Sequence, residues 1–147
     1  MNQEKMNIQW YPGHMTKTRR QIEADLKLVD AVCEIVDARI PMSSRNPDID
    51  SICGNKPRII VLNRMDLADP EATKRWAAYF RSKGMAVVIT ACKTRKGIND
   101  FVPAARSVLK EKLERDAARG MHRPVKVMVV GIPNVGKSTL INQISGR

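Results

Sequence analysis

Apolar residues along the chain fall into two kinds of pattern, short continuous runs and wider helical spacings. Four runs are rich in β-branched residues, and they predict strands buried on both faces of a sheet. These runs cover residues 31–36, 58–62, 85–90 and 125–130. The first run is interrupted by one charged residue, Glu34, and is still predicted as a buried strand.

Between these runs, apolar residues recur at spacings of three and four, which predicts amphipathic helices. The longest predicted helix begins at a cap at Asn99 and reaches Leu113. Helices alternating with strands predict an α/β fold with a mostly parallel sheet, whose ligands bind at the carboxyl ends of the strands. The other predicted helix starts are the Thr18/Gln21 capping box, Asn46-Pro47, Asp69-Pro70 and Ser138.

Composition places the chain among soluble globular proteins, with 147 residues of which 43% are hydrophobic and 28% charged. No apolar run approaches the roughly 18 residues of a membrane span, and the N-terminal stretch lacks an apolar signal core. A cytoplasmic protein without membrane contact is therefore predicted. The three cysteines, Cys33, Cys53 and Cys92, are too far apart to form a metal-ligand pair and are predicted to be reduced thiols.

The charge balance is strongly basic, with 26 Lys and Arg against 15 Asp and Glu and a net charge of +11. A cationic surface of this kind attracts polyanions, and phosphate backbones are the commonest partners. A solvated basic surface that serves only solubility is the alternative. Charge alone does not distinguish RNA from DNA.

Residues 131–138 read GIPNVGKS and match GxxxxGK[ST], the phosphate-binding P-loop. The motif follows a predicted strand and opens a predicted helix, which is the context that it requires. Backbone N–H groups of such a loop surround phosphate oxygens, and the helix N-terminus adds its positive dipole end. Lys137 would reach the β- and γ-phosphates, and Ser138 would ligate Mg²⁺. The predicted nucleotide-binding residues of this segment are Asn134, Val135, Gly136, Lys137, Ser138 and Thr139.

Residues 63–66, Asn63-Arg64-Met65-Asp66, follow the second predicted strand and resemble the NKxD motif that recognises guanine. The Asp66 carboxylate can accept hydrogen bonds from the N1 and N2 groups of guanine, a donor pair that adenine lacks. Asn63 would bond the base edge and tie this loop to the P-loop. Arg64 stands where the motif has Lys, and its planar guanidinium can still stack on a base. A polar turn between strand and helix is the alternative interpretation.

Residues 90–93, Thr90-Ala91-Cys92-Lys93, follow the third predicted strand and resemble the SAK motif. In that motif a backbone N–H contacts guanine O6, and Ala91 and Cys92 are the residues assigned to this contact. Small residues after a strand are common, so this segment alone is weak evidence for a guanine contact. Its presence in a chain that also has the NRMD segment and the P-loop supports the assignment.

The order of the motifs narrows the family, because the NRMD and TACK segments precede the P-loop instead of following it. This order resembles the circularly permuted GTPases of ribosome assembly. The stretches WYPGHM at 10–15 and DARIPMSSRNP at 37–47 are similar to those of bacterial ribosome biogenesis GTPase A, and the resemblance covers nearly the whole chain. It implies a P-loop NTPase-like, three-layer α/β fold with a mostly parallel, circularly permuted sheet.

The resemblance also implies a function and further site residues. It implies a GTPase that binds GTP or GDP with Mg²⁺ and assists late maturation of the large (50S) ribosomal subunit, with that subunit and its rRNA as partners and no DNA. It implies no glutamine to position water, and His14 is then a candidate catalytic residue. A histidine packed beside Trp10 is an equal alternative. Asn134 is a candidate K⁺ ligand, and Asp37 with Arg39 is expected to form an internal ion pair.

The chain ends at Arg147 soon after the P-loop, where the family continues. No switch threonine segment or DxxG follows, so residues 1–147 are expected to be the N-terminal part of a GTPase domain, incomplete at the C-terminus. The C-terminal helical RNA-binding domain of the family is absent from this sequence. We expect two strands of the usual sheet to be missing, strand 125–130 to be an open edge, and turnover of the polypeptide to be negligible.

The favoured hypothesis is therefore a permuted ribosome-assembly GTPase domain. The alternative is a basic RNA- or ribosome-binding module whose nucleotide site is vestigial or does not hydrolyse. An ATPase is a third reading, against which Asp66 argues. The sequence does not determine the oligomeric state. The basic positions that would contact RNA are Lys17, Arg19, Arg20, Arg106, Lys110, Arg115, Arg119, Arg123 and Lys126.

Overall fold

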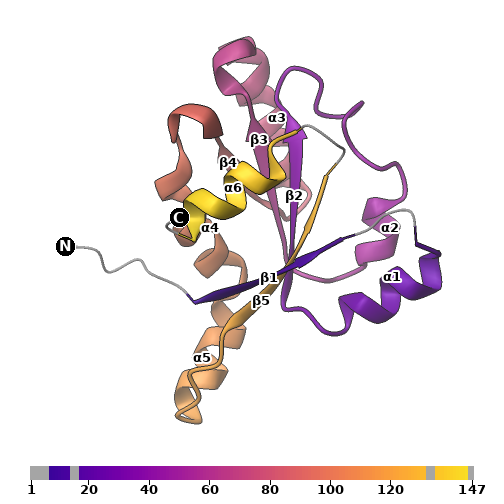
Figure 1. Ribbon diagram of the computed structural model, residues 1–147, viewed down its shortest axis with the longest axis vertical. Helices are drawn as coiled ribbons and strands as arrows, with labels where there is room; N and C mark the ends of the chain where they lie inside the picture. Colours follow the sequence, from indigo (N-terminus) through magenta and orange to yellow (C-terminus); the bar gives the residue numbers. More distant parts are fainter. Residues whose placement is uncertain (1–6, 14–16, 132–134, 146–147) are drawn as a thin grey trace.

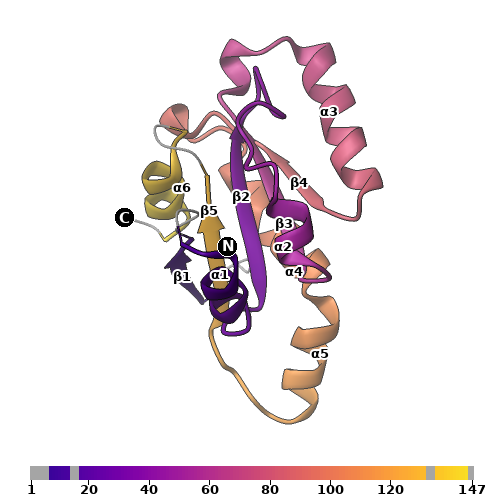
Figure 2. The same ribbon diagram turned by 90° about the vertical axis from the view of Figure 1, so that its right-hand side faces the viewer.

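A five-stranded parallel sheet forms the centre of the computed structural model, which describes residues 7–13, 17–131 and 135–145. The strands are ordered β1-β5-β2-β3-β4, and Figure 2 shows them in this order from left to right. The α/β class and the parallel sheet predicted from the sequence are confirmed. The strands are β1 (Ile8–Pro12), β2 (Ala31–Asp37), β3 (Arg58–Asn63), β4 (Ala86–Ile89) and β5 (Val125–Val130).

Helices cover both faces of the sheet and make a three-layer fold. In Figure 1, α4, α5 and α6 lie to the left of β2, whereas α1 and α2 lie to its right. Short 3₁₀ helices follow β3 and β4 at 65–67, 92–94 and 98–100. The α-helices are α1 (Arg19–Leu26), α2 (Ile49–Cys53), α3 (Pro70–Ser82), α4 (Phe101–Val108), α5 (Lys110–Ala118) and α6 (Lys137–Ile144).

The central strand β2 shows why the apolar runs form this sheet, because all seven of its residues are buried. Successive side chains of a strand point to opposite faces. Ile35 thus packs in one cluster with Phe101 of α4 and Leu140 of α6. Val32 belongs to the cluster of the other face, which includes Ile22 of α1. No described helix is long and apolar enough to cross a membrane.

Two predicted helix starts are confirmed by their capping bonds. The Thr18 hydroxyl accepts a hydrogen bond from the Gln21 N–H, and the Gln21 side chain accepts one from the Thr18 N–H, which completes the capping box of α1. The Asp69 side chain accepts the Ala72 N–H at 3.0 Å, and Pro70 is the first residue of α3. Local sequence alone therefore specifies where these two helices begin.

Two other helix predictions were wrong in detail. The Asn46 side chain accepts the Asp48 N–H in a turn, and α2 begins only at Ile49. The helix predicted from Asn99 to Leu113 is two helices, because Leu109 leaves helical geometry at φ −107° and ψ 14°. The Leu109 side chain is buried in the core. α5 follows directly, from Lys110 to Ala118, and its Leu113 packs against the same core cluster.

Strand β1 was missed, and with it the prediction of an open edge at β5 was wrong. β1 pairs in parallel with β5, from Ile8 opposite Val125 to Pro12 opposite Val129. Strand β5 therefore lies between β1 and β2 and is not an edge. The signal for β1 is weak because the strand spans five residues and ends in proline.

A buried charge network anchors the segment after β2 to the sheet. The Glu34 carboxylate, 4% exposed, receives Arg45 Nε at 2.7 Å and Arg58 Nη2 at 3.2 Å. Both guanidinium groups also reach Asp50 Oδ1 at 2.7 Å. The charged residue that interrupts the apolar run of β2 is thus neutralised by two cations, which is what burial of a carboxylate requires.

We predict that Glu34→Gln lowers the free energy of unfolding by about 3 kcal/mol, because it removes the buried charge that pairs with both guanidinium groups and leaves them only the exposed Asp50. Glu23→Gln is the matched control, since Glu23 forms an exposed ion pair with Arg19 and its loss costs about 0.5 kcal/mol or less. Urea denaturation of both variants measures the difference. Equal costs for the two variants would contradict a structural role of the Glu34 network.

Candidate nucleotide-binding site

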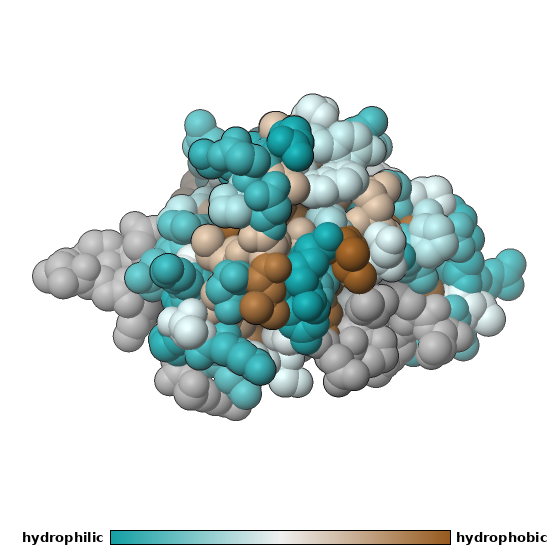
Figure 3. Space-filling model, turned by 90° about the horizontal axis from the view of Figure 1, so that it is seen from above, coloured by the Kyte–Doolittle hydropathy of each residue, from teal (hydrophilic) through white to brown (hydrophobic). Residues whose placement is uncertain are grey.

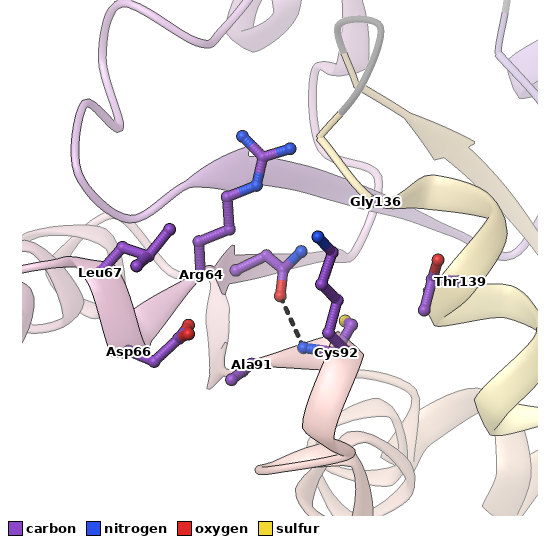
Figure 4. A pocket seen from close by; sticks show the side chains of 9 residues that line it. Arg64, Asp66, Leu67, Ala91, Cys92, Gly136 and Thr139 are labelled. Atoms are coloured by element: carbon purple, nitrogen blue, oxygen red, sulfur yellow. Dashed lines mark hydrogen bonds between the residues drawn. The ribbon is translucent and has the colours of Figure 1, made fainter.

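A cavity of about 360 Å³ opens at the carboxyl edge of the sheet, where the loops after β3, β4 and β5 meet. Figure 3 looks down on this end of the molecule and shows hydrophilic side chains around a few exposed hydrophobic ones. Figure 4 shows the cavity from close by. Its lining residues are Asn63, Arg64, Asp66, Leu67, Ala91, Cys92, Lys93, Gly136 and Thr139.

Asn63 is the junction of the three loops. Its side chain is buried, and its Nδ2 donates to the Val135 carbonyl of the P-loop at 2.9 Å. Its Oδ1 accepts the Thr90 hydroxyl at 2.9 Å and the Cys92 N–H at 3.0 Å. The predicted tie between the NRMD segment and the P-loop is confirmed. One amide group thereby holds three segments that lie far apart in the sequence.

Asp66 lies at the rim of the cavity, where its side chain is exposed in the 3₁₀ helix Met65–Leu67. The Met65 N–H donates to the Thr90 carbonyl at 2.9 Å, so this helix is attached to the next strand's loop. In Figure 4 Asp66 stands on the opposite side of the cavity from Thr139 of α6. A carboxylate presented in this way is available to hydrogen-bond donors of a ligand.

The Arg64 guanidinium is held by Asp37, the last residue of β2. Arg64 has a left-handed backbone, with φ 65°, and its Nη1 donates to Asp37 Oδ2 at 3.0 Å. Arg39 Nη2 donates to the same carboxylate at 2.7 Å, so the predicted ion pair of Asp37 and Arg39 is confirmed. The hydrogen bonds from Arg39 lower the pKa of Asp37 to about 2, which keeps it ionised.

Two glycines of the P-loop, Gly131 and Gly136, lie in close contact with neighbouring groups. Gly136 has a φ of 106°, and a Cβ there would lie 2.5 Å from Asn63 Nδ2. A Cβ on Gly131 would lie 2.7 Å from Ile35 Cγ2, so both glycines allow backbone approach that a side chain would prevent. Of the predicted site residues, Asn134 and His14 lie outside the described residues.

Helix α6 begins without a side-chain cap, whereas α1 and α3 are capped by their own residues. Its N-cap is Gly136, and no acidic residue occupies its first turn. Lys137 is half-buried, and Ser138 and Thr139 are exposed at this end. Gly136 offers the first N–H groups of α6 no side-chain acceptor, and these groups together with the helix dipole favour an anion.

The loop after β4 also contacts α6. The Cys92 N–H predicted to contact a base oxygen donates to Asn63, so a base would have to share or displace that bond. The Gln143 amide of α6 donates to the Cys92 carbonyl, a contact that the sequence analysis missed.

Burial raises the pKa of the Cys92 thiol, in line with the predicted reduced state. Leu67 and Lys93 are further lining residues that were not assigned to the site.

We predict that Gly136→Ala destabilises the protein by about 2–3 kcal/mol, since alanine meets both a strained φ and the Asn63 amide. Gly120→Ala is the control, because Gly120 also has a positive φ, 69°, but has open space around its Cβ position. Its expected cost is about 1 kcal/mol. Thermal and urea unfolding would reveal the difference, and equal costs would contradict the close contact with Asn63.

Known proteins resemble the chain over most of its length. Ribosome biogenesis GTPase A of Priestia megaterium is 49% identical over 97% of this chain and 50% of its own length. Mitochondrial ribosome-associated GTPase 1 of Bos taurus is 38% identical over 92% of this chain and 40% of its own length. A family model described as 50S ribosome-binding GTPase matches residues 126–147. The chain thus spans about half the length of the relatives that it matches.

Solved structures agree with the sequence matches. Crystal structures of GNP-bound and GDP-bound YlqF from T. maritima each match with a TM-score of 0.59, at 35% and 36% identity. They cover 88% and 87% of this chain and 48% of the YlqF chain. The predicted fold class and the resemblance to the ribosome biogenesis GTPase A family are confirmed.

Proposed function

We propose that this relative of the ribosome biogenesis GTPase A family binds guanine nucleotides and acts as a cytoplasmic GTPase in assembly of the large (50S) ribosomal subunit. The observation that carries the proposal is the Asn63 junction, which joins the two loops of a guanine site to a P-loop at one cavity. Residues 1–147 then form the part of the GTPase domain in which the guanine loops precede the P-loop.

The phosphates of the nucleotide would lie at the start of α6. The uncapped N-terminus of this helix offers N–H groups and a positive dipole end, and Lys137 adds a full positive charge. The exposed Ser138 hydroxyl is a hard oxygen donor of the kind that Mg²⁺ prefers, with phosphate oxygens and waters as its other ligands. Mg²⁺ would supply charge neutralisation at the β- and γ-phosphates when bound.

The base would lie between the loops after β3 and β4. Asp66 would accept the two guanine N–H donors, and Ala91 and Cys92 would border the base edge from the other loop. Arg64 lines the same cavity, and Met65 supports the turn through its bond to Thr90. This arrangement favours guanine because adenine would leave the Asp66 carboxylate without its donor pair.

Two further site residues rest on the family resemblance. We propose His14 as the residue that positions the attacking water and Asn134 as a K⁺ ligand. A group that orients water acts by placing it in line with the γ-phosphate, and a monovalent cation adds charge neutralisation there. In a polypeptide that also supplies groups around the γ-phosphate, His14→Ala should then lower the hydrolysis rate without a comparable loss of GTP affinity.

Calorimetry with GDP, GTP and ATP on this chain tests the proposal. Binding of GDP and GTP without binding of ATP is the expected result, and Lys137→Ala should abolish it. If no nucleotide binds while RNA does, the function would be that of a basic RNA-binding module with a vestigial site. ATP binding equal to GTP binding would refute base recognition by Asp66.

We predict that Asp66→Asn weakens GDP binding by about 1.5–3 kcal/mol and improves binding of xanthosine diphosphate. The loss is that of a hydrogen-bonded charge contact, and the gain follows because xanthine offers a carbonyl where guanine has an amino group. Asp48→Asn is the control, since Asp48 is exposed, makes no side-chain capping bond and lies on another loop. Unchanged GDP affinity in Asp66→Asn would disprove the assignment.

We predict near-equal GDP and GTP affinities and negligible hydrolysis for the polypeptide of residues 1–147 by itself. Stabilisation of the γ-phosphate transition state needs groups around that phosphate, and no DxxG follows the P-loop within this sequence. Steady-state phosphate release measures turnover, with Lys137→Ala as the blank. Substantial release that depends on Lys137 would show that these 147 residues suffice for hydrolysis.

We predict that the chain binds ribosomal RNA with an affinity that falls steeply with salt, by about 0.7–0.9 log units per log unit of salt for each phosphate contact. The double variant Lys110→Gln/Arg115→Gln removes two exposed positive charges from α5. If both contact phosphates, the slope of log affinity against log salt concentration should become shallower by about 1.4–1.8. Lys74→Gln with Arg75→Gln removes the same charge from α3 as a control. Equal slopes for the two double variants would refute contact through α5.

A further inference from the structure

We propose that Asp37 is a positioning residue for base recognition, because it holds the Arg64 side chain in place as a fixed wall of the cavity. The inference rests on the proposed guanine site and adds to it a residue that does not line the cavity. Asp37 is the last residue of β2, whereas the two guanine loops follow β3 and β4.

Arg64 is constrained at both ends of its side chain. Its backbone is left-handed, with φ 65°, a conformation shared only with Arg95 among the non-glycine residues that the structure describes. At the other end, Nη1 donates to Asp37 Oδ2 at 3.0 Å. Figure 4 shows the Arg64 side chain extending from the cavity wall, away from Asp66. The side chain between these two ends lines the cavity.

The Asp37 carboxylate is itself rigidly placed. It is 4% exposed and lies at the last position of β2, directly opposite Asn63 in the parallel ladder. The next N–H, that of Ala38, donates to the Asn63 carbonyl at 2.7 Å. The Asp37 N–H donates to the Ser44 hydroxyl at 3.0 Å. The sheet therefore fixes the distance between Asp37 and the residue that precedes Arg64.

Arg39 supplies the remaining hydrogen bonds of this carboxylate. Its backbone N–H and its Nε donate to Asp37 Oδ1 at 2.9 and 3.0 Å, and its Nη2 donates to Oδ2. Oδ2 is thus shared between Arg39 and Arg64. With two cations against one buried carboxylate, the ionised form of Asp37 is the form that holds Arg64.

The consequence for binding is preorganisation. An arginine with several rotatable bonds loses conformational freedom when a ligand packs against it, and that cost weakens binding. Asp37 fixes the Arg64 side chain before the nucleotide binds. The side chain has therefore already lost its conformational freedom in the unbound protein, and binding does not have to restrict it further. Releasing Arg64 should weaken GDP binding by about 3- to 10-fold, although Asp37 itself does not contact the base.

Three variants test the proposal: Asp37→Asn, Arg64→Met and the double variant. Asn at position 37 places an N–H₂ group against the guanidinium donors, and Met keeps most of the length of the Arg64 stem without its charge. Asp116→Asn is the matched control, because Asp116 is also a buried carboxylate with two cationic partners, Lys112 and Arg123, and lies on α5. Each variant is titrated with GDP by calorimetry at a temperature where it is folded.

The expected result is a 3- to 10-fold loss of GDP affinity in Asp37→Asn, none in Asp116→Asn, and no further loss when Asp37→Asn is added to Arg64→Met. Equal losses from Asp37→Asn in both backgrounds would overturn the proposal, because Asp37 would then not act through Arg64. GDP binding unchanged in Asp37→Asn would overturn it as well.

A second measurement needs no nucleotide. The heteronuclear ¹⁵N NOE of Arg64 Nε should be that of an ordered group in the unmodified protein and that of a mobile group in Asp37→Asn. An unchanged NOE would overturn the proposal even if the chain bound no nucleotide. Failure of the unmodified protein to bind GDP would instead refute the proposed function and leave the NOE to decide on Asp37.

Discussion

The arrangement of the whole site depends on one buried amide, the side chain of Asn63. Its three hydrogen bonds join the loops after β3, β4 and β5, and each partner is a group that would be costly to bury alone. A side chain with both donors and an acceptor is needed here, because the three segments present a carbonyl, a hydroxyl and an N–H. The Asn63 amide also requires glycine at position 136, since any larger residue there would occupy the space of the amide.

The parallel sheet makes a permuted order of loops compatible with one site. All five described strands point their carboxyl ends to the same edge, so the loops that follow them meet there whatever their order in the sequence. β5 carries the P-loop although it is the last of the described strands in sequence order, and it lies next to β2. The carboxyl end of β2 thereby reaches the site through Asp37, which binds Arg64.

Local signals in the sequence predicted much of this structure. The four apolar runs, the capping box at Thr18 and the Asp69-Pro70 start all depend on neighbouring residues, and all were found. Features that depend on distant contacts were missed or wrong. β1 is defined by pairing with β5, the break at Leu109 follows from burial against the sheet, and the Gln143 contact needs α6 to lie beside the loop after β4. In the site, the motifs identified Asn63 and Asp66, but the bond between Arg64 and Asp37 could not be foreseen because it joins the loop after β3 to the end of β2.

The pairing of β1 with β5 has a consequence for the order of folding. The two strands are about 120 residues apart in the chain, so their contact closes a loop of about that length. During synthesis at roughly 5–20 residues per second, β1 would wait on the order of 6–25 s for its partner. Strands β2, β3 and β4 are complete well before that, and they pair with one another in sequence order. Among the described strands, the first to be made is therefore the last to find its place, and it joins the sheet beside the strand that carries the P-loop.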